Sequence, residues 1–223
     1  GGNTITVSGT GASTWTNSGT FTATGTVNFT GAAPQIGASN FNNLTISGGG
    51  TKTLQGSITP TGDLTISGGL FDLGSYTANR ASSGGTLTLA NGVTLKMGET
   101  STFPSNYSTH SIGTTSTVEY AGTSTPQAIG TLNSSQSYGH LTLSGGATKT
   151  FPSGTTGISG DLARSGGTID ATTNNATVDF NGSGAQAVAA GNYYNLTFSN
   201  AGIKTFASGT SKIKNTFTIS GGA

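Results

Sequence analysis

Short triplets of alternating apolar and polar residues recur along the whole chain. Examples are Leu44-Thr45-Ile46, Leu141-Thr142-Leu143 and Leu196-Thr197-Phe198, and such triplets return about every 20 residues, a spacing typical of stacked repeats. Alternation with a period of two predicts strands with one buried face. Gly-Gly, Ser-Gly and Asn-Gly pairs separate the triplets and predict turns. No segment shows a helical period, so the pattern predicts an all-β chain.

The chain also contains a longer repeat that spans several of these triplets. Each of three units continues through a glycine, a glutamine, a Leu-Thr strand and a Lys-Thr strand in the same order. We therefore expect a single repetitive β domain over residues 1–223, with repeat units at approximately 26–116, 117–176 and 177–223 and a partial unit at 1–25. The units open with Thr26-Val27-Asn28-Phe29, Thr117-Val118-Glu119-Tyr120 and Thr177-Val178-Asp179-Phe180.

Two folds accommodate these strands. A parallel β-solenoid stacks like residues of successive coils, whereas an antiparallel β-sandwich places short strands in two facing sheets. The long repeat favours a parallel β-solenoid of about ten coils, because similar units stack readily on one another. The alternative is an antiparallel β-sandwich completed by a donated strand. The predicted core consists of Leu44, Ile46, Leu64, Ile66, Leu141, Leu143, Leu196, Phe198, Phe217 and Ile219.

Composition narrows the functional classes. Only 7% of the residues are charged and the formal net charge is +1, whereas disordered chains usually carry high net charge and few β-branched residues. The scattered lysines and arginines form no basic cluster of the kind that nucleic-acid binding requires. No apolar run is long enough for a membrane-spanning helix. Cysteine is absent, which excludes disulfides and thiolate metal sites.

The repeated motifs resemble a known class of sequences. Thr-Val-x-Phe, then Asn-Leu-Thr and Lys-Thr, then Leu-Thr-Ile before Gly-Gly, as at Leu64-Thr65-Ile66, is similar to the Thr/Gly/Asn-rich β-strand repeats of large bacterial secreted and cell-surface proteins. The resemblance covers most of the chain and is weakest from about Gly85 to Ser116. It implies an extracellular, repetitive structural protein rather than an enzyme.

Residues with catalytic or metal-binding chemistry are few and scattered. Glycoside hydrolysis needs paired carboxylates and zinc needs three or four ligands, but the two histidines, His110 and His140, lie apart in the sequence. Asp170 with Asn174-Asn175 is a weak calcium candidate, and a turn is the preferred interpretation. We expect no catalytic residue, no metal and no cofactor. The acidic residues are Asp63, Asp72, Glu99, Glu119, Asp161, Asp170 and Asp179.

Other recurring residues have structural and functional interpretations. Lys52, Lys149 and Lys204 recur at one place in the repeat; polyanion binding or an isopeptide bond would use them, but we expect exposed lysines that discourage sheet-edge pairing. Aromatic residues at like positions, such as Phe41 and Tyr138, could stack on sugars, but we expect them to cap the core. Thr-x-Thr pairs could order water or bind ice, but in the sequence they do not recur at one coil position.

Self-association is the functional prediction. Residues 1–10 and 212–223 read as ordinary repeat sequence without the polar cap that keeps soluble solenoids from stacking. We expect a subunit of an extracellular filament or surface fibre, assembled head to tail with other copies of itself. The alternative is a segment of a giant surface adhesin that binds glycans or other surfaces; the chain opens without an initiator Met, so we expect a processed or excised piece. The predicted assembly residues are Thr4, Ile5, Thr6, Val7, Thr216, Phe217, Thr218 and Ile219.

Overall fold

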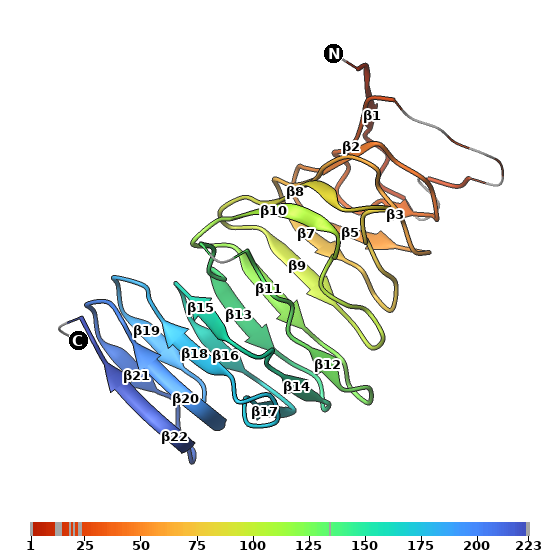
Figure 1. Ribbon diagram of the computed structural model, residues 1–223. Helices are drawn as coiled ribbons and strands as arrows, with labels where there is room; N and C mark the ends of the chain where they lie inside the picture. Colours follow the sequence, from red (N-terminus) through yellow and green to blue (C-terminus); the bar gives the residue numbers. More distant parts are fainter. Residues whose placement is uncertain are drawn as a thin grey trace. The chain divides into compact units, whose positions relative to one another are not determined.

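The computed structural model describes residues 2–11, 15–17, 19, 21, 24–133 and 135–221. These residues form strands, turns and bends and no helix. Within each of the two compact units, residues 1–116 and 117–223, the strands pair side by side in parallel (Figure 1). The chain is an all-β parallel solenoid of about ten coils, as the repeat predicts, and the parallel pairing rules out the antiparallel sandwich.

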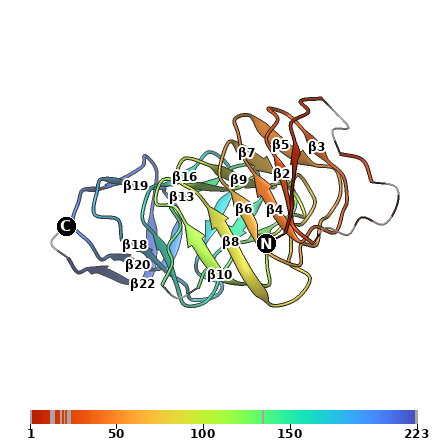
Figure 2. The ribbon, with the colours of Figure 1, turned by 90° about the horizontal axis from the view of Figure 1, so that it is seen from above.

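The first unit contains two parallel sheets. In the first sheet, β2, β4, β6, β8 and β10 follow one another in chain order (Figure 2). Its strands are β1 (Thr4–Val7), β2 (Thr26–Phe29), β4 (Asn43–Ile46), β6 (Leu64–Ile66), β8 (Gly84–Leu89) and β10 (Tyr107–Ile112). The strands of the second sheet are β3 (Gln35–Ile36), β5 (Thr51–Leu54), β7 (Leu70–Asp72) and β9 (Thr94–Met97).

The second unit has three rows of strands. Two long strands, β20 (Asn192–Phe198) and β22 (Lys212–Ile219), bend from one row into the next at a register shift beside Tyr193. One row holds β11 (Thr117–Tyr120), β13 (His140–Leu143), β16 (Leu162–Arg164), β19 (Gln186–Val188) and β21 (Lys204–Phe206). The others begin with β12 (Gln127–Ala128), β14 (Thr148–Thr150) and β17 (Thr168–Asp170), and with β15 (Thr155–Ile158) and β18 (Thr177–Phe180).

The core consists of apolar ladders that run from coil to coil. Val27, Leu44 and Leu64 are registered partners, as are Val118, Leu141 and Leu162 in the second unit, and all are buried. Of the ten predicted core residues, eight are buried; Phe217 and Ile219 are 45% and 56% exposed, because β22 has a described neighbour on one side only.

The repeated motifs do not keep one place in the coil. In the second unit, the opening strand of one repeat, β11, lies in the row of β13 and β16, whereas the opening strand of the next, β18, lies in the row of β15 and β20. Val118 stacks on Leu141, and Val178 stacks on Leu196 in the same register. The repeat therefore describes how one strand stacks on the next, rather than a fixed face of the solenoid.

Glycines at the corners let the coils stack closely. Gly145 has φ +68°, and a Cβ at this position would overlap with the carbonyl oxygen of Gly122 in the neighbouring coil. Only glycine meets both demands at once, a positive φ and close backbone approach. This requirement accounts for part of the high glycine content, 38 residues.

Candidate functional site

The predicted assembly residues lie on the outer strands β1 and β22. β1 pairs with β2 in the register Thr4↔Thr26 to Val7↔Phe29, and β22 pairs with β20 in the register Asn195↔Thr216 to Phe198↔Ile219. In the part of the chain that the structure describes, neither strand pairs with a strand on its other side. Both therefore present a row of backbone N–H and C=O groups that can pair with a further strand.

Apolar side chains on these outer strands are half uncovered. Ile5 and Phe217 are each 45% exposed, whereas their registered partners Val27 and Leu196 are fully buried. The Phe217 ring packs edge-on against Phe198, with 5.1 Å between ring centroids. These side chains follow the inward ladder of their neighbours, so their exposed sides are those that a further coil would cover.

The two outer strands differ in charge. β22 carries Lys212 and Lys214, and Lys204 lies on β21 in the same unit. The Lys214 ammonium lies 5.6 Å from the centroid of the Tyr194 ring. No charged side chain precedes Lys52 in the sequence, so the strand β1 is electrically neutral.

The repeated lysines are not on an exposed face, and that prediction is wrong. Lys52 and Lys149 are fully buried, at positions that stack on Phe71 and Ile169. Their alternation places them inward, where the aliphatic stem packs with the apolar ladder. Lys204, on the outermost row, is only partly buried.

Each of the three lysine ammonium groups binds backbone carbonyls at a turn. Lys149 Nζ donates to Gly122 O at 2.9 Å and to Ala147 O at 3.0 Å. Lys204 Nζ donates to Gly182 O at 2.8 Å, and Lys52 Nζ to Gly48 O at 3.2 Å. Such bonds give each ammonium hydrogen-bond partners within the protein and account for the lysines structurally.

Burial affects the titration of two of these lysines. It lowers the pKa of Lys52 from its ordinary 10.5. It also lowers the pKa of Lys204, although the nearby Asp179 charge opposes the shift. Desolvation of the charged form is the cause in both.

Two buried glutamines, which the sequence interpretation did not assign, complete this arrangement. Gln127 Oε1 accepts a hydrogen bond from Gly122 N at 2.8 Å, and Gln186 Oε1 accepts one from Gly182 N at 3.0 Å. Gln127 and Gln186 are 4% and 3% exposed. The sequence could have indicated this role, because the two glutamines recur at the same position of the repeat. A polar residue that recurs at an inward position needs a buried hydrogen-bond partner.

The acidic residues of the repeat point outward and bond to the next coil. Ser144 Oγ donates to Glu119 Oε1 at 2.6 Å, and Ser199 Oγ donates to Asp179 Oδ2 at 3.0 Å. Burial raises the pKa of Asp179, and the Ser199 bond opposes this. In the first repeat Asn28 takes the same place and accepts from Ser47 at 2.8 Å. This position serves strand-to-strand bonding.

The weak calcium candidate is a turn. Both oxygens of Asp170 accept hydrogen bonds from the backbone and side chains of Thr172 and Thr173, at 2.6 to 3.0 Å. Burial alone would raise the pKa of Asp170, but these bonds outweigh it and lower the pKa. Asn174 Nδ2 donates to Phe151 O at 2.8 Å. The oxygens that calcium would need are already engaged.

The two histidines lie in different units, His110 in residues 1–116 and His140 in residues 117–223. His140 Nδ1 accepts a bond from Asp161 N at 3.0 Å and lies 3.4 Å from the Asp161 carboxylate. His110 is buried beside Phe103, with 5.7 Å between ring centroids, and burial lowers its pKa. Among the described residues, no group of three or more His, Cys, Asp or Glu side chains could hold a metal.

The repeated aromatic residues lie mostly inside. Phe41, Tyr138 and Tyr193 occupy the same place in the repeat and are buried. Tyr193 OH donates to Ala189 O at 2.6 Å, so the hydroxyl of this core residue is satisfied. These rings are not available as platforms for sugars.

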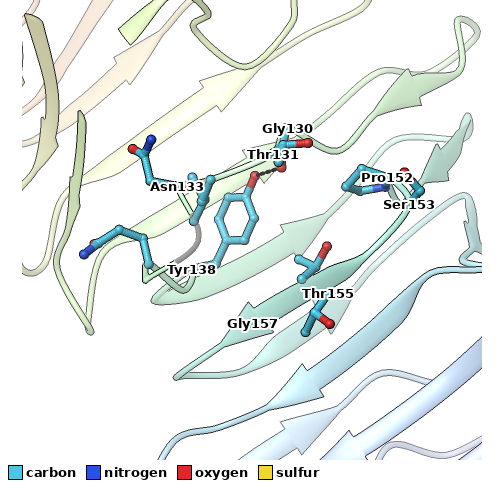
Figure 3. Close-up of a pocket in the computed structure, with 11 residues that line it drawn as sticks. Gly130, Thr131, Asn133, Tyr138, Pro152, Ser153, Thr155 and Gly157 are labelled. Carbon is cyan, nitrogen blue, oxygen red and sulfur yellow. Dashed lines mark hydrogen bonds between the residues drawn. The ribbon is translucent and has the colours of Figure 1, made fainter. Parts of the chain in front are cut away.

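A small hollow in the second unit is lined by polar groups. Tyr138 OH donates to Gly130 O at 2.7 Å at its wall (Figure 3). The cavity volume is about 40 Å³, enough for a few waters and far below the roughly 300–1,000 Å³ of ordinary ligand sites. It lies between Thr131 and Thr155 and gives no reason to assign a sugar or cofactor.

Among the residues described, no helix is long and apolar enough to cross a membrane. The candidate functional site is the pair of outer strands, β1 and β22, because their open edges carry half-exposed apolar side chains. No family model matches the chain, and no curated protein and no solved structure matches it.

Proposed function

We propose that the chain is a structural subunit of an extracellular filament or surface fibre, joined head to tail through β22 of one copy and β1 of the next. The observation that carries the proposal is the partial exposure of Ile5, Phe217 and Ile219. They sit on inward ladders, yet they are 45%, 45% and 56% exposed. A strand from another copy would cover them and pair with the open backbone edges.

The sequence of the two strands fits such a junction. Both alternate threonine with an apolar residue, so a parallel continuation of the existing ladder would bring apolar side chains together inside and threonines together outside. Leu196 stacks on Phe217 and Ile5 stacks on Val27; the junction would join these two ladders. The expected pairs are Thr216 with Thr4, Phe217 with Ile5, Thr218 with Thr6, and Ile219 with Val7.

Charge disfavours a junction between two β22 strands. A junction of two β22 strands would bring Lys212 and Lys214 of one copy near those of another, and like charges repel. The β1 strand carries no charged side chain, because the first charged residue in the sequence is Lys52. A head-to-tail contact does not close on itself and therefore generates a filament.

The expected strength of the junction is modest. Burying a large apolar side chain completely is worth about 1.5–3 kcal/mol, and these side chains are already half covered. Backbone hydrogen bonds add about 0.5–1.5 kcal/mol each, while association costs at least about 4 kcal/mol. Assembly should therefore depend strongly on protein concentration.

The alternative is one segment of a giant surface adhesin. In that protein, a further coil of the same chain would cover the same edge. The resemblance to repeats of large bacterial surface proteins supports either version, together with an extracellular location and a role without catalysis. Binding to glycans without cleavage would favour the adhesin.

The test is sedimentation velocity and negative-stain electron microscopy over a range of protein concentrations. The intact chain should form filaments, and a variant lacking residues 1–10 should stay monomeric while keeping its β-rich circular dichroism. A matched control, Thr65→Lys, changes an outward side chain on β6 and should leave assembly intact. An intact chain that stays monomeric at high concentration would refute the filament.

A further inference from the structure

The first sheet of the first unit carries a regular array of small polar side chains on its outer face. Thr6, Asn28, Thr45, Thr65, Thr88 and Ser111 are successive registered partners on β1, β2, β4, β6, β8 and β10. A second column two residues earlier contains Thr4, Thr26, Asn43, Asp63, Thr86 and Thr109. The sequence suggested that Thr-x-Thr pairs keep no fixed coil position. Two of them, Thr4/Thr6 and Thr86/Thr88, do share these columns, whereas the other four strands carry a different residue at one of the two positions.

The hydroxyl groups of this array are not used by the protein. In the described part of the chain, the side-chain hydroxyls of Thr6, Thr45, Thr65 and Thr88 make no hydrogen bond within the protein. The next outward column behaves differently: Ser47 Oγ donates to Asn28 Oδ1 at 2.8 Å and Ser67 Oγ donates to Ile46 O at 3.4 Å. A column of uncommitted hydroxyls, held in place by a sheet, is free to bind water.

The spacing of the array is fixed by the sheet. Adjacent strands lie about 4.8 Å apart, and residues two apart along a strand lie about 6.6 Å apart. A two-dimensional lattice of oxygens with these repeats lies near the oxygen spacings on a prism face of hexagonal ice. Threonine has a stiff side chain, so each hydroxyl keeps its place, and its methyl group covers the sheet between hydroxyls.

The side chains of this face limit the kinds of ligand that it can bind. Asp63 is the one charged side chain in the two columns, and its Oδ1 already accepts a bond from Thr86 N at 2.8 Å. The Arg80 guanidinium lies beside it and donates to Gly62 O at 3.1 Å. An anionic or cationic polymer therefore finds no row of like charges to bind. The columns contain no aromatic ring on which a sugar could stack, so a polysaccharide fibre has no platform.

We propose that this outer face, centred on Thr45, Thr65 and Thr88, binds ice through an ordered layer of water. The role is additional to filament formation, which uses β1 and β22 and not the face of β6. In a filament, however, each copy would present a further array, and multivalency would strengthen adsorption.

The test is inhibition of ice recrystallisation, together with crystal shaping, by the purified chain. Intact protein should inhibit growth, and Thr65→Lys, which sets a long charged side chain in the middle of the array, should raise the effective concentration about tenfold or more, equivalent to roughly 1.4 kcal/mol. The matched control is Thr142→Lys, which alters the same Leu-Thr motif on β13 outside the array and should act like intact protein.

Three results would overturn the inference. The first is that folded intact protein inhibits ice recrystallisation no more than an inert protein at equal mass. The others are that Thr65→Lys and Thr142→Lys lose inhibition equally, or that Thr65→Lys loses none. Circular dichroism and thermal melts of each variant show that the fold is kept, and Thr65→Val, which keeps the shape but removes the hydroxyl, provides a second variant. Since Thr65→Lys should not alter assembly, failure here leaves the filament proposal standing.

Discussion

Lys149 stacks directly on Gln127 in the parallel register, and the two side chains bind the two backbone groups of one residue, Gly122. Gln127 Oε1 accepts from Gly122 N at 2.8 Å, and Lys149 Nζ donates to Gly122 O at 2.9 Å. Gly182 has the same relation to Gln186 and Lys204. A buried lysine from one coil therefore ties down the turn of the preceding coil.

Lys149→Met should destabilise the second unit by about 1–3 kcal/mol, because the Gly122 and Ala147 carbonyls each lose a hydrogen bond from the ammonium. Urea unfolding with unchanged slope measures the loss. The control is Lys96→Met, which removes a partly exposed ion pair with Asp72 at 3.4 Å and should cost less than about 1 kcal/mol. Equal stability of Lys149→Met and the intact chain would contradict this, because desolvation of the ammonium would then cancel the gain from its bonds.

Ile66 and Ile219 occupy the same motif position, but the first is fully buried and the second is 56% exposed. Ile66→Ala should cost about 2–5 kcal/mol through the cavity that it leaves. Ile219→Ala should cost well under half of that in dilute solution and should weaken assembly instead. Similar unfolding losses for both in monomeric protein would contradict the exposed position of β22.

Gly49 and Gly50 are adjacent in the sequence but differ in the space available for a side chain. Gly50 has φ +75° and a Cβ there would overlap with Ala32 O, whereas a Cβ on Gly49 meets nothing within 4 Å. Gly50→Ala should destabilise the first unit by more than about 1 kcal/mol. Gly49→Ala should be neutral or slightly stabilising. Thermal melts of the two variants decide the matter, and equal melting temperatures would contradict the close stacking of coils.

His110 makes the first unit sensitive to acid. Burial lowers its pKa from the ordinary 6.5, so the unfolded chain binds this proton more tightly than the folded chain does. Its stability contribution is complete above about pH 6.5 and declines as the pH falls toward the lowered folded pKa.

The pH dependence is measured by urea unfolding at neutral and mildly acidic pH. His110→Leu, matching the neighbouring Leu87, should remove the loss of stability at the acidic pH. The control is His140→Asn, because the equivalent positions of the other two repeats are occupied by Asn43 and Asn195. An acid loss that persists unchanged in His110→Leu would show that another group is responsible.

The sequence was sufficient for the strands and the stacking of coils but not for every side chain. Leu44, Leu141 and Leu196 were predicted inside because alternation with a period of two leaves no other place for them. Lys52 and Lys149 obey the same alternation, yet their charge suggested an exposed face. Lys52 binds carbonyls of the turn just before it, at Gly48 and Gly49, and Lys149 also binds Gly122, which is 27 residues away. Alternation alone does not display either set of acceptors.

The threonine array was concealed for a related reason. Thr45, Thr65 and Thr88 are registered neighbours, but the loops between them differ in length. A fixed sequence period therefore misses them, whereas backbone pairing aligns them. The exposure of Phe217 and Ile219 likewise depends on which neighbour covers β22, a property of the whole sheet.

Covalent trapping of the junction tests the central claim most directly. The chain contains no cysteine, so Thr6→Cys and Thr218→Cys can be combined in one protein without background thiols. In the expected junction these outward residues face each other on paired strands about 4.8 Å apart, within the Cα separation of about 4.4–6.8 Å that a disulfide spans. Mild oxidation at assembly concentrations should give a ladder of covalent multimers on non-reducing gels, and an out-of-register control with Thr4→Cys and Thr218→Cys should give far fewer. Monomers alone, or an equal ladder from both pairs, would contradict head-to-tail assembly through β22 and β1.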